Sequence, residues 1–505
     1  MSIAVTLPVA TASAGGTAST LVMGLSSEPP NIDPQLYTGV SAETVCLQLY
    51  RGLFAYNASG QIVPALAQSY TQVSPTEYTF LLRNNLKFSN GAPLTADDVV
   101  FTLQRIQDPK VGAYLATDFA TIKSATAVNA RTVDIRLSAP NGALIDELAS
   151  PYASIVSKQF TQANGDSLKT VALGAGPYKL QQWVPGQQLT VVKNPYYYRK
   201  GYPKTGKIVF QFLSNGDTRV AALESGAVNL IEYVPWPNIP QLKSTPGIKY
   251  QGTDGPFMYL LFNTQVKPFN SPLVRQAINY AINRKAIVTD AFSGTGSELR
   301  GLPIPASSWA YNAKYDGNVY SYNPAKAKQL LRQAGYPNCF SASILTTAQY
   351  AFHLQTAEVI QQDLNAIGCN ISLVDPDWAT RVSLGNQGRY QMAVNGTVGD
   401  DNDPSFLSKL FRSAPTYTYY GYSLGYKDPK VDSLLDQALA TSNQAARKQL
   451  YNKAQADIIA DSPYAFLTWR EQGYAYQAKV KGFVNLPGFL SYMSGYTLED
   501  TTVSQ

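Results

Sequence analysis

Apolar and polar residues follow two periods along this chain, and both periods recur from one end to the other. Short stretches such as 21–25 and 132–137 have the composition and alternation of strands. The stretch 351–367 instead has apolar residues at helical spacing. These are Leu354, Ala357, Ile360, Leu364 and Ile367. Strands and helices that alternate throughout a chain in this way predict an α/β fold.

Signals at the ends of two predicted helices support this interpretation. Thr95 and Asp98 have the spacing of a capping box, which begins a predicted helix over 95–106. Pro272 begins another helix, predicted over 272–287, because a proline at the first helical position gives up no hydrogen bond. These residues therefore predict where helices start, which the hydrophobic period leaves open.

One β-α-β unit stands out in the second half of the chain. Predicted strands over 343–347 and 371–374 flank the helix over 351–367. A crossover helix between two strands of one sheet makes the strands parallel. We therefore expect a parallel pair here.

The three cysteines fit this unit. Cys339 and Cys369 each stand just before one of its strands, so neighbouring strands would bring the two sulfur atoms to one edge of the sheet. We expect a Cys339–Cys369 disulfide, which suits an exported protein. Two buried thiols remain the alternative, because spacing does not fix connectivity. Cys46 lies inside a predicted helix and is expected to be a small core residue.

Length and composition narrow the class of protein. A chain of 505 residues is long enough for two or three domains. Charged residues are only 15% and tyrosines number 34, which suits a secreted protein with aromatic contacts. The net charge of +6 is spread without a basic block, so we expect no nucleic-acid partner. The single histidine, His353, argues against histidine metal clusters, and we expect no metal and no cofactor.

The N-terminal residues have the composition of a leader. Residues 1–19 are small, apolar and hydroxylic, and Ala12-Ser13-Ala14 resembles a signal-peptide cleavage site, although the first basic residue is Arg51. We interpret 1–19 as the remnant of an export signal, with a disordered leader as the alternative. This end has no cysteine to which a lipid could be attached, so we expect no lipid anchor.

A loop with three carboxylates lies within 391–411. A predicted strand leads into Asp400, Asp401 and Asp403, and a helix restarts after Pro404. In α/β proteins, loops after strand ends are where ligand contacts gather. The alternative is a turn whose aspartates cap the next helix.

Ordered motifs run through almost the whole of residues 20–500. They are PALA at 64–67, KFSNGAPLTADDVVF at 87–101, NPYY at 194–197, YLLFNT at 259–264, VRQAINYAI at 274–282 and AKAKQLL at 325–331. Together they resemble the extracytoplasmic solute-binding proteins of peptide- and nickel-type ABC importers, the family 5 proteins that include oligopeptide and dipeptide binders. Asn283 stands where that family usually has aspartate.

This resemblance implies a two-lobed periplasmic-binding-protein fold of type II, cluster C, with an extra domain inserted in the first lobe. The implied divisions are 20–45, 166–254 and 474–505 for the first lobe, 46–165 for the insert, and 255–473 for the second lobe. Two lobes of this kind close by a hinge on a bound solute.

The implied function is that of the solute-binding subunit of an ABC importer. It would bind a peptide or another amine-bearing small solute and deliver it to a membrane permease, as a periplasmic monomer and not as an enzyme. Three alternatives stay open. They are an oligosaccharide binder, a sensor or chaperone with the same fold, and a secreted hydrolase with paired carboxylates.

The resemblance also assigns residues to the site. In family members that bind peptides, an aspartate after a G-x-x-x pattern pairs with the ligand ammonium, and Gly396 to Asp400 match that pattern. A buried ammonium requires such a partner, because an unpaired charge costs several kcal/mol. Asp403 would then cap the following helix. The other implied ligand-binding residues are Trp378, Tyr37, Thr38, Gly39, Phe257 and Thr397, of which Thr397 replaces a family tryptophan and Trp378 has core packing as its alternative.

In such proteins an arginine or another cation binds the carboxylate of the ligand, but this sequence lacks it at the positions where the family has it. Positions expected to hold arginine hold Gly385 and Val394. Arg381, Arg389 and Arg412 lie nearby in sequence but match no motif. The hypothesis is therefore a solute with a cationic nitrogen, whose carboxylate reader is lost or moved.

Overall fold

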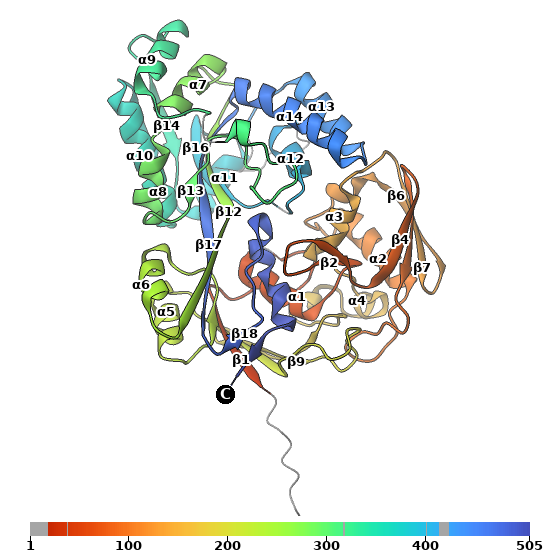
Figure 1. The fold of residues 1–505 in the computed structure, drawn as a ribbon. Coiled ribbons are helices and arrows are strands. Elements are labelled where there is room, and N and C mark those ends of the chain that lie inside the picture. The colour runs from red at the N-terminus through yellow and green to blue at the C-terminus, as the bar shows by residue number, and fades with distance from the viewer. Residues whose placement is uncertain (1–18, 38, 317–318, 400, 414–423, 505) are drawn as a thin grey trace, which may run out of the picture.

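Two long strands join the two halves of the molecule. They are β12 (Ile248–Phe262) and β17 (Tyr464–Gln477), and they pair antiparallel from end to end (Figure 1). The computed structural model describes residues 19–37, 39–316, 319–399, 401–413 and 424–504. Both strands are long because each one passes through both lobes.

A single sheet passes through both lobes, in the order β15-β14-β16-β12-β17-β11-β1-β10-β9-β8. The first-lobe strands are β11 (Leu230–Ile231), β1 (Thr20–Leu25), β10 (Lys207–Phe212), β9 (Gln188–Lys193) and β8 (Tyr178–Val184). The second-lobe strands are β16 (Met392–Thr397), β14 (Ser341–Leu345) and β15 (Asn370–Val374). A short strand, β13 (Ser297–Glu298), pairs with β17 outside this order. The two crossing strands thus hold the lobes together through backbone hydrogen bonds.

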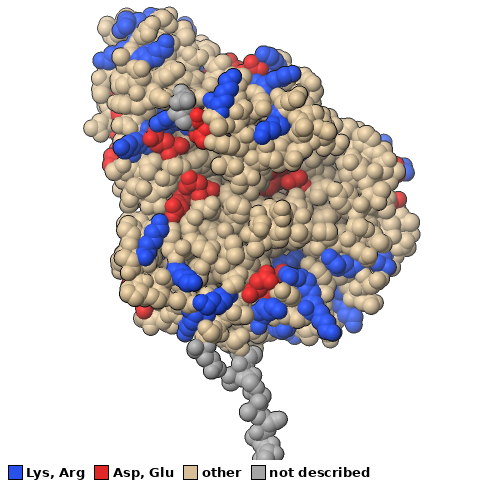
Figure 2. Space-filling model, viewed as in Figure 1, with Lys and Arg blue, Asp and Glu red and all other residues tan. Residues whose placement is uncertain are grey.

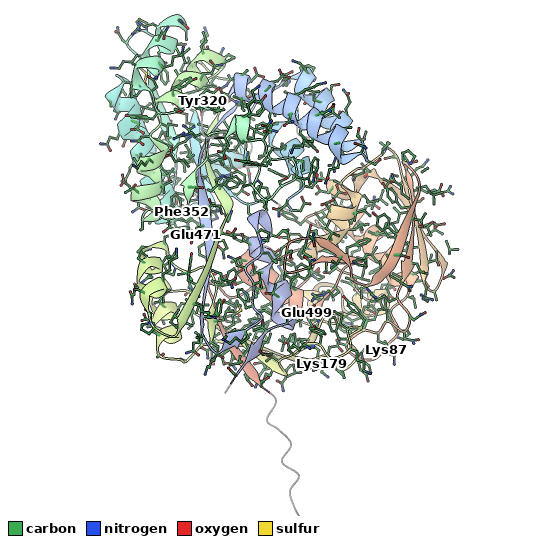
Figure 3. All side chains as sticks on the ribbon, viewed as in Figure 1. Lys87, Lys179, Tyr320, Phe352, Glu471 and Glu499 are labelled. Carbon is green, nitrogen blue, oxygen red and sulfur yellow. A yellow bond between two sulfur atoms is a disulfide. The ribbon has the colours of Figure 1, made fainter. Side chains whose placement is uncertain are left out.

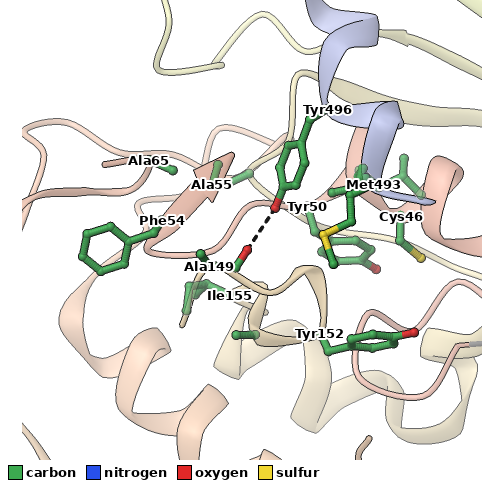
Figure 4. Close-up of a cluster of buried hydrophobic side chains, with 14 of the residues drawn as sticks. Cys46, Tyr50, Phe54, Ala55, Ala65, Ala149, Tyr152, Ile155, Met493 and Tyr496 are labelled. Atoms are coloured by element: carbon green, nitrogen blue, oxygen red, sulfur yellow. Dashed lines mark hydrogen bonds between the residues drawn. The ribbon is translucent and has the colours of Figure 1, made fainter. Parts of the chain in front are cut away.

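The first lobe shares its hydrophobic core with a smaller α+β part. Around the main sheet lie α1 (Val40–Leu49), α5 (Gly216–Glu224), α6 (Ile239–Ser244) and the 3₁₀ segment η7 (Gly488–Glu499). The smaller part has a sheet of β4 (Ala67–Ser74), β5 (Glu77–Leu82), β7 (Thr132–Leu137) and β6 (Ile122–Asn129), a hairpin of β2 (Phe54–Tyr56) and β3 (Ile62–Pro64), and the helices α2 (Ala96–Gln107), α3 (Leu144–Ala149) and α4 (Lys158–Asn164). Figure 4 shows where the two parts pack together, with the Tyr496 hydroxyl donating to the carbonyl oxygen of Ala149 at 3.3 Å.

The capping box predicted at Thr95 and Asp98 is confirmed.

The second lobe has a hydrophobic core on each face of its part of the sheet. Helices α7 (Pro272–Ala281), α8 (Arg284–Phe292), α9 (Pro324–Gln333) and α10 (Ala351–Ala366) cover one face. Helices α12 (Leu407–Phe411), α13 (Pro429–Leu439) and α14 (Gln444–Asp461) cover the other (Figure 1). Because both faces are covered, the strands between them are buried along most of their length.

One predicted helix is wrong in its extent. The pattern over 272–287 predicts one helix, but the structure has two, with α7 ending at Ala281 and α8 beginning at Arg284. The Asn283 side chain accepts a hydrogen bond from the amide of Ala286 at 3.2 Å and so caps α8. The helical period continues across the break, because both helices pack on the same core, so periodicity does not reveal it.

The β-α-β unit and the disulfide are confirmed. Strands β14 and β15 pair in parallel, with Ser341 opposite Asn370. Cys339 and Cys369 form a disulfide just before these residues, with their Cα atoms 4.8 Å apart. Cys46 is a buried free cysteine in the core, as expected.

Within the described ranges, no helix combines the length and the apolar composition needed to cross a membrane. Of the predicted leader, 1–19, only residue 19 lies among the described residues. The predicted division into two lobes and an insert at the stated boundaries stays a prediction.

Candidate ligand-binding site between the lobes

The carboxyl ends of parallel strands from both lobes point to the middle of the crossing pair. In the second lobe, β16 runs along β12 from Phe262 toward Phe257. In the first lobe, β11 runs along β17 from Tyr476 to Ala475, toward the same middle. Ligands of α/β proteins bind at carboxyl strand ends. The lobe junction is therefore the candidate site.

The loop before α1 enters this junction from the first lobe. Tyr37 is buried, and its ring stacks on Tyr152 with 4.6 Å between centroids. Within the described part of the chain its hydroxyl has no hydrogen-bond partner, and burial raises the pKa of Tyr37. Gly39 has a φ of +91° and precedes the first helical residue, a conformation that favours glycine. Thr38 lies outside the described residues.

A buried carboxylate fixes this loop to the strand ends. Glu232, directly after β11, accepts hydrogen bonds from the amide and the hydroxyl of Ser26 at 3.1 and 3.0 Å. It also accepts from the hydroxyls of Ser41 and Thr44 in α1. Burial raises the pKa of Glu232, and these donors lower it. The start of α1 is thereby held at the junction.

Trp378 lies at the surface of the second lobe and not in its core. It begins α11 (Trp378–Asn386), where Asp377 caps the helix by accepting from the amide of Thr380 at 3.0 Å. The indole is half-buried and packs edge-on against His353, with 5.9 Å between ring centroids. The guanidinium of Arg381 lies over the same indole at 5.5 Å. Contact between Trp378 and a solute stays a prediction.

Thr397 and Phe257 lie opposite each other on β16 and β12. Thr397 is half-buried at the strand end, and its hydroxyl donates to the carbonyl oxygen of Val398 at 3.3 Å. Phe257 is fully buried among aromatic rings. Those rings are Tyr259, Phe466, Trp469 and Phe489, with centroid distances of 5.6 to 6.0 Å. Core packing accounts for the burial of Phe257, and ligand contact by either residue stays a prediction.

Asp401 and Asp403 of the acidic loop both make structural hydrogen bonds. Asp400 lies outside the described residues. Asp403 caps the segment η6 (Pro404–Phe406) by accepting from the amide of Ser405 at 2.9 Å, so its predicted capping role is confirmed. It also forms a buried ion pair with Arg447 of α14 at 2.7 Å. Asp401 is buried and accepts from the amide of Asp403 at 2.9 Å.

The three nearby arginines differ in position. Arg381 is buried, and its Nη2 donates to the carbonyl oxygen of Val394 at 2.5 Å. Arg389 is exposed. Arg412 is also exposed and pairs with Asp436 at 3.0 Å. Only Arg381 is thus placed beside Trp378 and His353.

Sequence reasoning missed another arginine, Arg470 of β17. Its side chain is only 6% exposed. Its Nη1 lies 3.4 Å from the hydroxyl of Tyr233 in the first lobe, and its guanidinium lies 5.4 Å from the ring centroid of Phe352 in the second. Figure 3 shows Phe352 and the next strand residue, Glu471, beside the crossing strands where the lobes meet. In the sequence, Arg470 directly follows the mostly apolar run 464–469, which does not by itself indicate a binding residue.

Nearby positive charges affect the pKa of His353. It is buried in the first turns of α10, and its pKa is lowered to about 3 by burial and then by Arg381 and Arg470. The imidazole is therefore neutral at physiological pH. Two guanidinium groups, those of Arg381 and Arg470, therefore lie close enough to act on this imidazole.

An acidic cavity of about 340 Å³ lies beside the crossing strands. Both lobes line it, including Asp254, Glu298, Asp316 and Trp469. Burial raises the pKa of Asp254, which accepts a hydrogen bond from the hydroxyl of Ser297 at 2.5 Å. In Figure 2 acidic side chains gather across the middle of the face shown, while many lysines and arginines lie toward its two ends.

Two α/β lobes joined by a pair of crossing strands, with strand ends converging at the junction, define a two-lobed periplasmic binding protein. Residues 61–419 match the family described as bacterial extracellular solute-binding proteins, family 5 Middle. The chain belongs to this family.

Relatives match nearly the full chain. The glutathione-binding protein GsiB of Pectobacterium atrosepticum is 29% identical over 492 residues, covering 96% of this chain and 94% of the relative. The structure of AgaA from A. tumefaciens R10 in complex with agropinic acid is 38% identical, with a TM-score of 0.87, covering 96% and 99%. The structure of DppA from Helicobacter pylori in complex with the peptide STSA is 28% identical, with a TM-score of 0.83, covering 96% and 98%.

Family membership decides the class of function. Proteins of this family are periplasmic, bind small solutes such as peptides, and work with ABC importers. The chain is therefore a binding protein and not an enzyme, which rules against the hydrolase alternative.

Proposed function

We propose that this chain is the periplasmic solute-binding subunit of an ABC importer, and that its solute is a peptide or another small molecule with a cationic nitrogen. It acts as an exported monomer. The two lobes close on the solute and present it to the membrane permease.

The observation that carries this proposal is the convergence of strand ends from both lobes at one junction. Two partly exposed aromatic side chains support it, Tyr233 of the first lobe beside Arg470 and Trp378 of the second lobe beside Arg381. Such rings bury the apolar part of a small solute, while a few polar groups fix its orientation.

Asp400 narrows the class of solute. The relatives are named for different ligands, glutathione, agropinic acid and a peptide among them. Family membership therefore leaves the solute open. A carboxylate at Asp400, after the pattern Gly396-Thr397-Val398-Gly399, supports recognition of a charged nitrogen.

Calorimetry on protein freed of co-purified solute tests the proposal. A simple amine, a dipeptide and a longer peptide would be titrated into the wild type and Asp400→Ala. Loss of a buried ammonium partner is expected to weaken binding of amine-bearing solutes by about 100-fold or more. Asp436→Ala removes an exposed carboxylate of the same lobe and is expected to bind like the wild type. Equal binding by Asp400→Ala would remove the basis for an amine anchor.

Mass spectrometry of small molecules released by denaturation tests the class of solute directly. A released compound with an amine or another cationic nitrogen supports the proposal. Release of a neutral oligosaccharide would contradict it.

A further inference from the structure

Arg470 has far fewer partners than the buried arginines Arg51, Arg219, Arg284 and Arg447. Arg51 and Arg447 form ion pairs with carboxylates at 2.8 and 2.7 Å. Arg219 and Arg284 each donate to several backbone carbonyl groups. Among the described residues, Arg470 makes one long hydrogen bond, 3.4 Å to the Tyr233 hydroxyl, and its buried Nε has no acceptor.

A buried guanidinium is normally compensated, because an uncompensated charge away from water is costly. Among the residues that the structure describes, no carboxylate lies within ion-pair distance of Arg470. Two positions along the strand, the Nε2 of Gln472 is also buried without an acceptor. This part of β17 therefore presents N–H donors that nothing in the described protein satisfies.

Partly exposed aromatic side chains surround Arg470. Tyr233, Phe352 and Tyr492 are all partly exposed, although Arg470 itself is buried. Tyr233 has a φ of +50°, a strained conformation for tyrosine, and it places its hydroxyl against the guanidinium. The first lobe and the second lobe thus each hold one side of the Arg470 head group.

We propose that Arg470 is the carboxylate reader of this binding protein, pairing with a carboxylate of the enclosed solute at the lobe junction. The planar guanidinium offers parallel N–H donors that match the two oxygens of a carboxylate. This inference rests on the proposed function and deepens it, since a solute with both groups would be zwitterionic. It also explains why the usual positions, Gly385 and Val394, can lack arginine: the cation has moved to a crossing strand.

The position on β17 has a consequence for specificity. The Tyr233 side of Arg470 belongs to the first lobe and the Phe352 side to the second. A carboxylate bound here is enclosed only when both lobes surround it. Arg470 therefore favours the closed form for solutes with a carboxylate at the correct distance and leaves their neutral analogues weakly bound.

Acid and amide probes test the inference. The dipeptide Met-Leu, its C-terminal carboxamide and the dicarboxylate glutarate would be titrated into the wild type, Arg470→Gln and Arg470→Lys. Arg389→Gln is the matched control, since it removes an exposed arginine of the same lobe. Binding would be followed by calorimetry and by the fluorescence of the junction tryptophans.

The wild type is expected to bind the free acid at least 10-fold more tightly than the carboxamide. Arg470→Gln should abolish this difference, Arg470→Lys should keep part of it, and Arg389→Gln should keep all of it. Glutarate should give a saturable fluorescence change in the wild type that Arg470→Gln lacks. Equal binding of acid and carboxamide by the wild type, or an unchanged preference in Arg470→Gln, would overturn the inference.

The two proposals fail separately. If amines bind through Asp400 but acid and carboxamide bind equally, the proposed function stands and the role of Arg470 is wrong. If no peptide binds but glutarate binds through Arg470, the amine class is wrong and the carboxylate reader stands. If neither peptides nor glutarate bind to the wild type, both are wrong.

Thermal unfolding of the solute-free protein separates binding from a structural role. Because the buried Nε of Arg470 has no acceptor, Arg470→Gln is expected to have the same Tm as the wild type or a higher one. A Tm several degrees lower would indicate that Arg470 serves the fold and would overturn the inference.

Discussion

Asp403 and Arg447 show how one residue of the acidic loop acquires a structural task. Both side chains are buried, and the carboxylate accepts from two guanidinium nitrogens at 2.7 and 2.9 Å. Nη1 of Arg447 also donates to the carbonyl oxygen of Gly142, across the lobe boundary. The pair therefore anchors the segment that begins at Asp403 to α14.

At the residue scale, Asp403→Ala is expected to lower the free energy of unfolding by about 3–5 kcal/mol, because it leaves Arg447 buried without its carboxylate. Urea denaturation followed by circular dichroism measures this change. The control Asp436→Ala breaks the exposed pair with Arg412 and should cost less than about 1 kcal/mol. Similar small losses in both variants would show that the buried pair adds nothing.

Single elements of the second lobe are fixed by local chemistry. Asn283 separates α7 from α8 by capping the second helix, and it stands where the family usually has aspartate. Aspartate and asparagine accept the same amide hydrogen bond, so this departure from the family leaves the element intact. The disulfide joins the starts of β14 and β15 in the same local way.

At the element scale, Cys339→Ser should lower the free energy of unfolding by about 2–4 kcal/mol, because the disulfide closes a loop with a sequence separation of 30. Denaturant unfolding without reductant measures it. Cys369→Ser should give the same loss, and the double variant should add little to it.

Thiol titration is the control for this prediction. Unfolded, unreduced wild type should show one reactive thiol, Cys46, of its three cysteines. Three reactive thiols would contradict the disulfide.

In the whole molecule, the small part of the first lobe directly contacts the second lobe. Lys409 pairs with Asp118 at 3.1 Å, and the amide of Gly142 donates to the carbonyl oxygen of Leu439 at 2.6 Å. Asp146 of α3 lies in the same region. Its pKa is raised to about 7, chiefly by burial and then by Asp403, while Arg447 lowers it. This contact region therefore contains a carboxyl group whose pKa is raised chiefly by burial.

At the scale of the molecule, this carboxyl group predicts a pH dependence. An acid whose pKa is higher in the folded protein contributes its stability fully below the unfolded value of 3.8 and loses it as pH rises through about 7. The Tm of the wild type should therefore fall more between pH 5 and pH 8 than that of Asp146→Asn. Asp290→Asn, which changes an exposed carboxylate, should keep the dependence of the wild type. An equal fall in Asp146→Asn would show that Asp146 is not responsible.

The sequence by itself determined the features that depend on neighbours along the chain. Alternation predicted the α/β class, the capping box predicted the start of α2, and the β-α-β unit predicted the disulfide. Ordered motifs predicted the family, which the match over 61–419 confirms. Each of these signals is local or repeated, so no distant contact is needed to read it.

Only the tertiary structure decided which distant side chains meet. Arg470 and Tyr233 are 237 positions apart, and they meet because β17 and β11 pair in one sheet. Phe257 faces an aromatic core because of the register of β12 against its neighbours, since each step along a strand reverses the face. Strand register and the crossing of strands between lobes are properties of the assembled sheet. The sequence alone therefore did not identify Arg470 as the arginine proposed to bind the carboxylate.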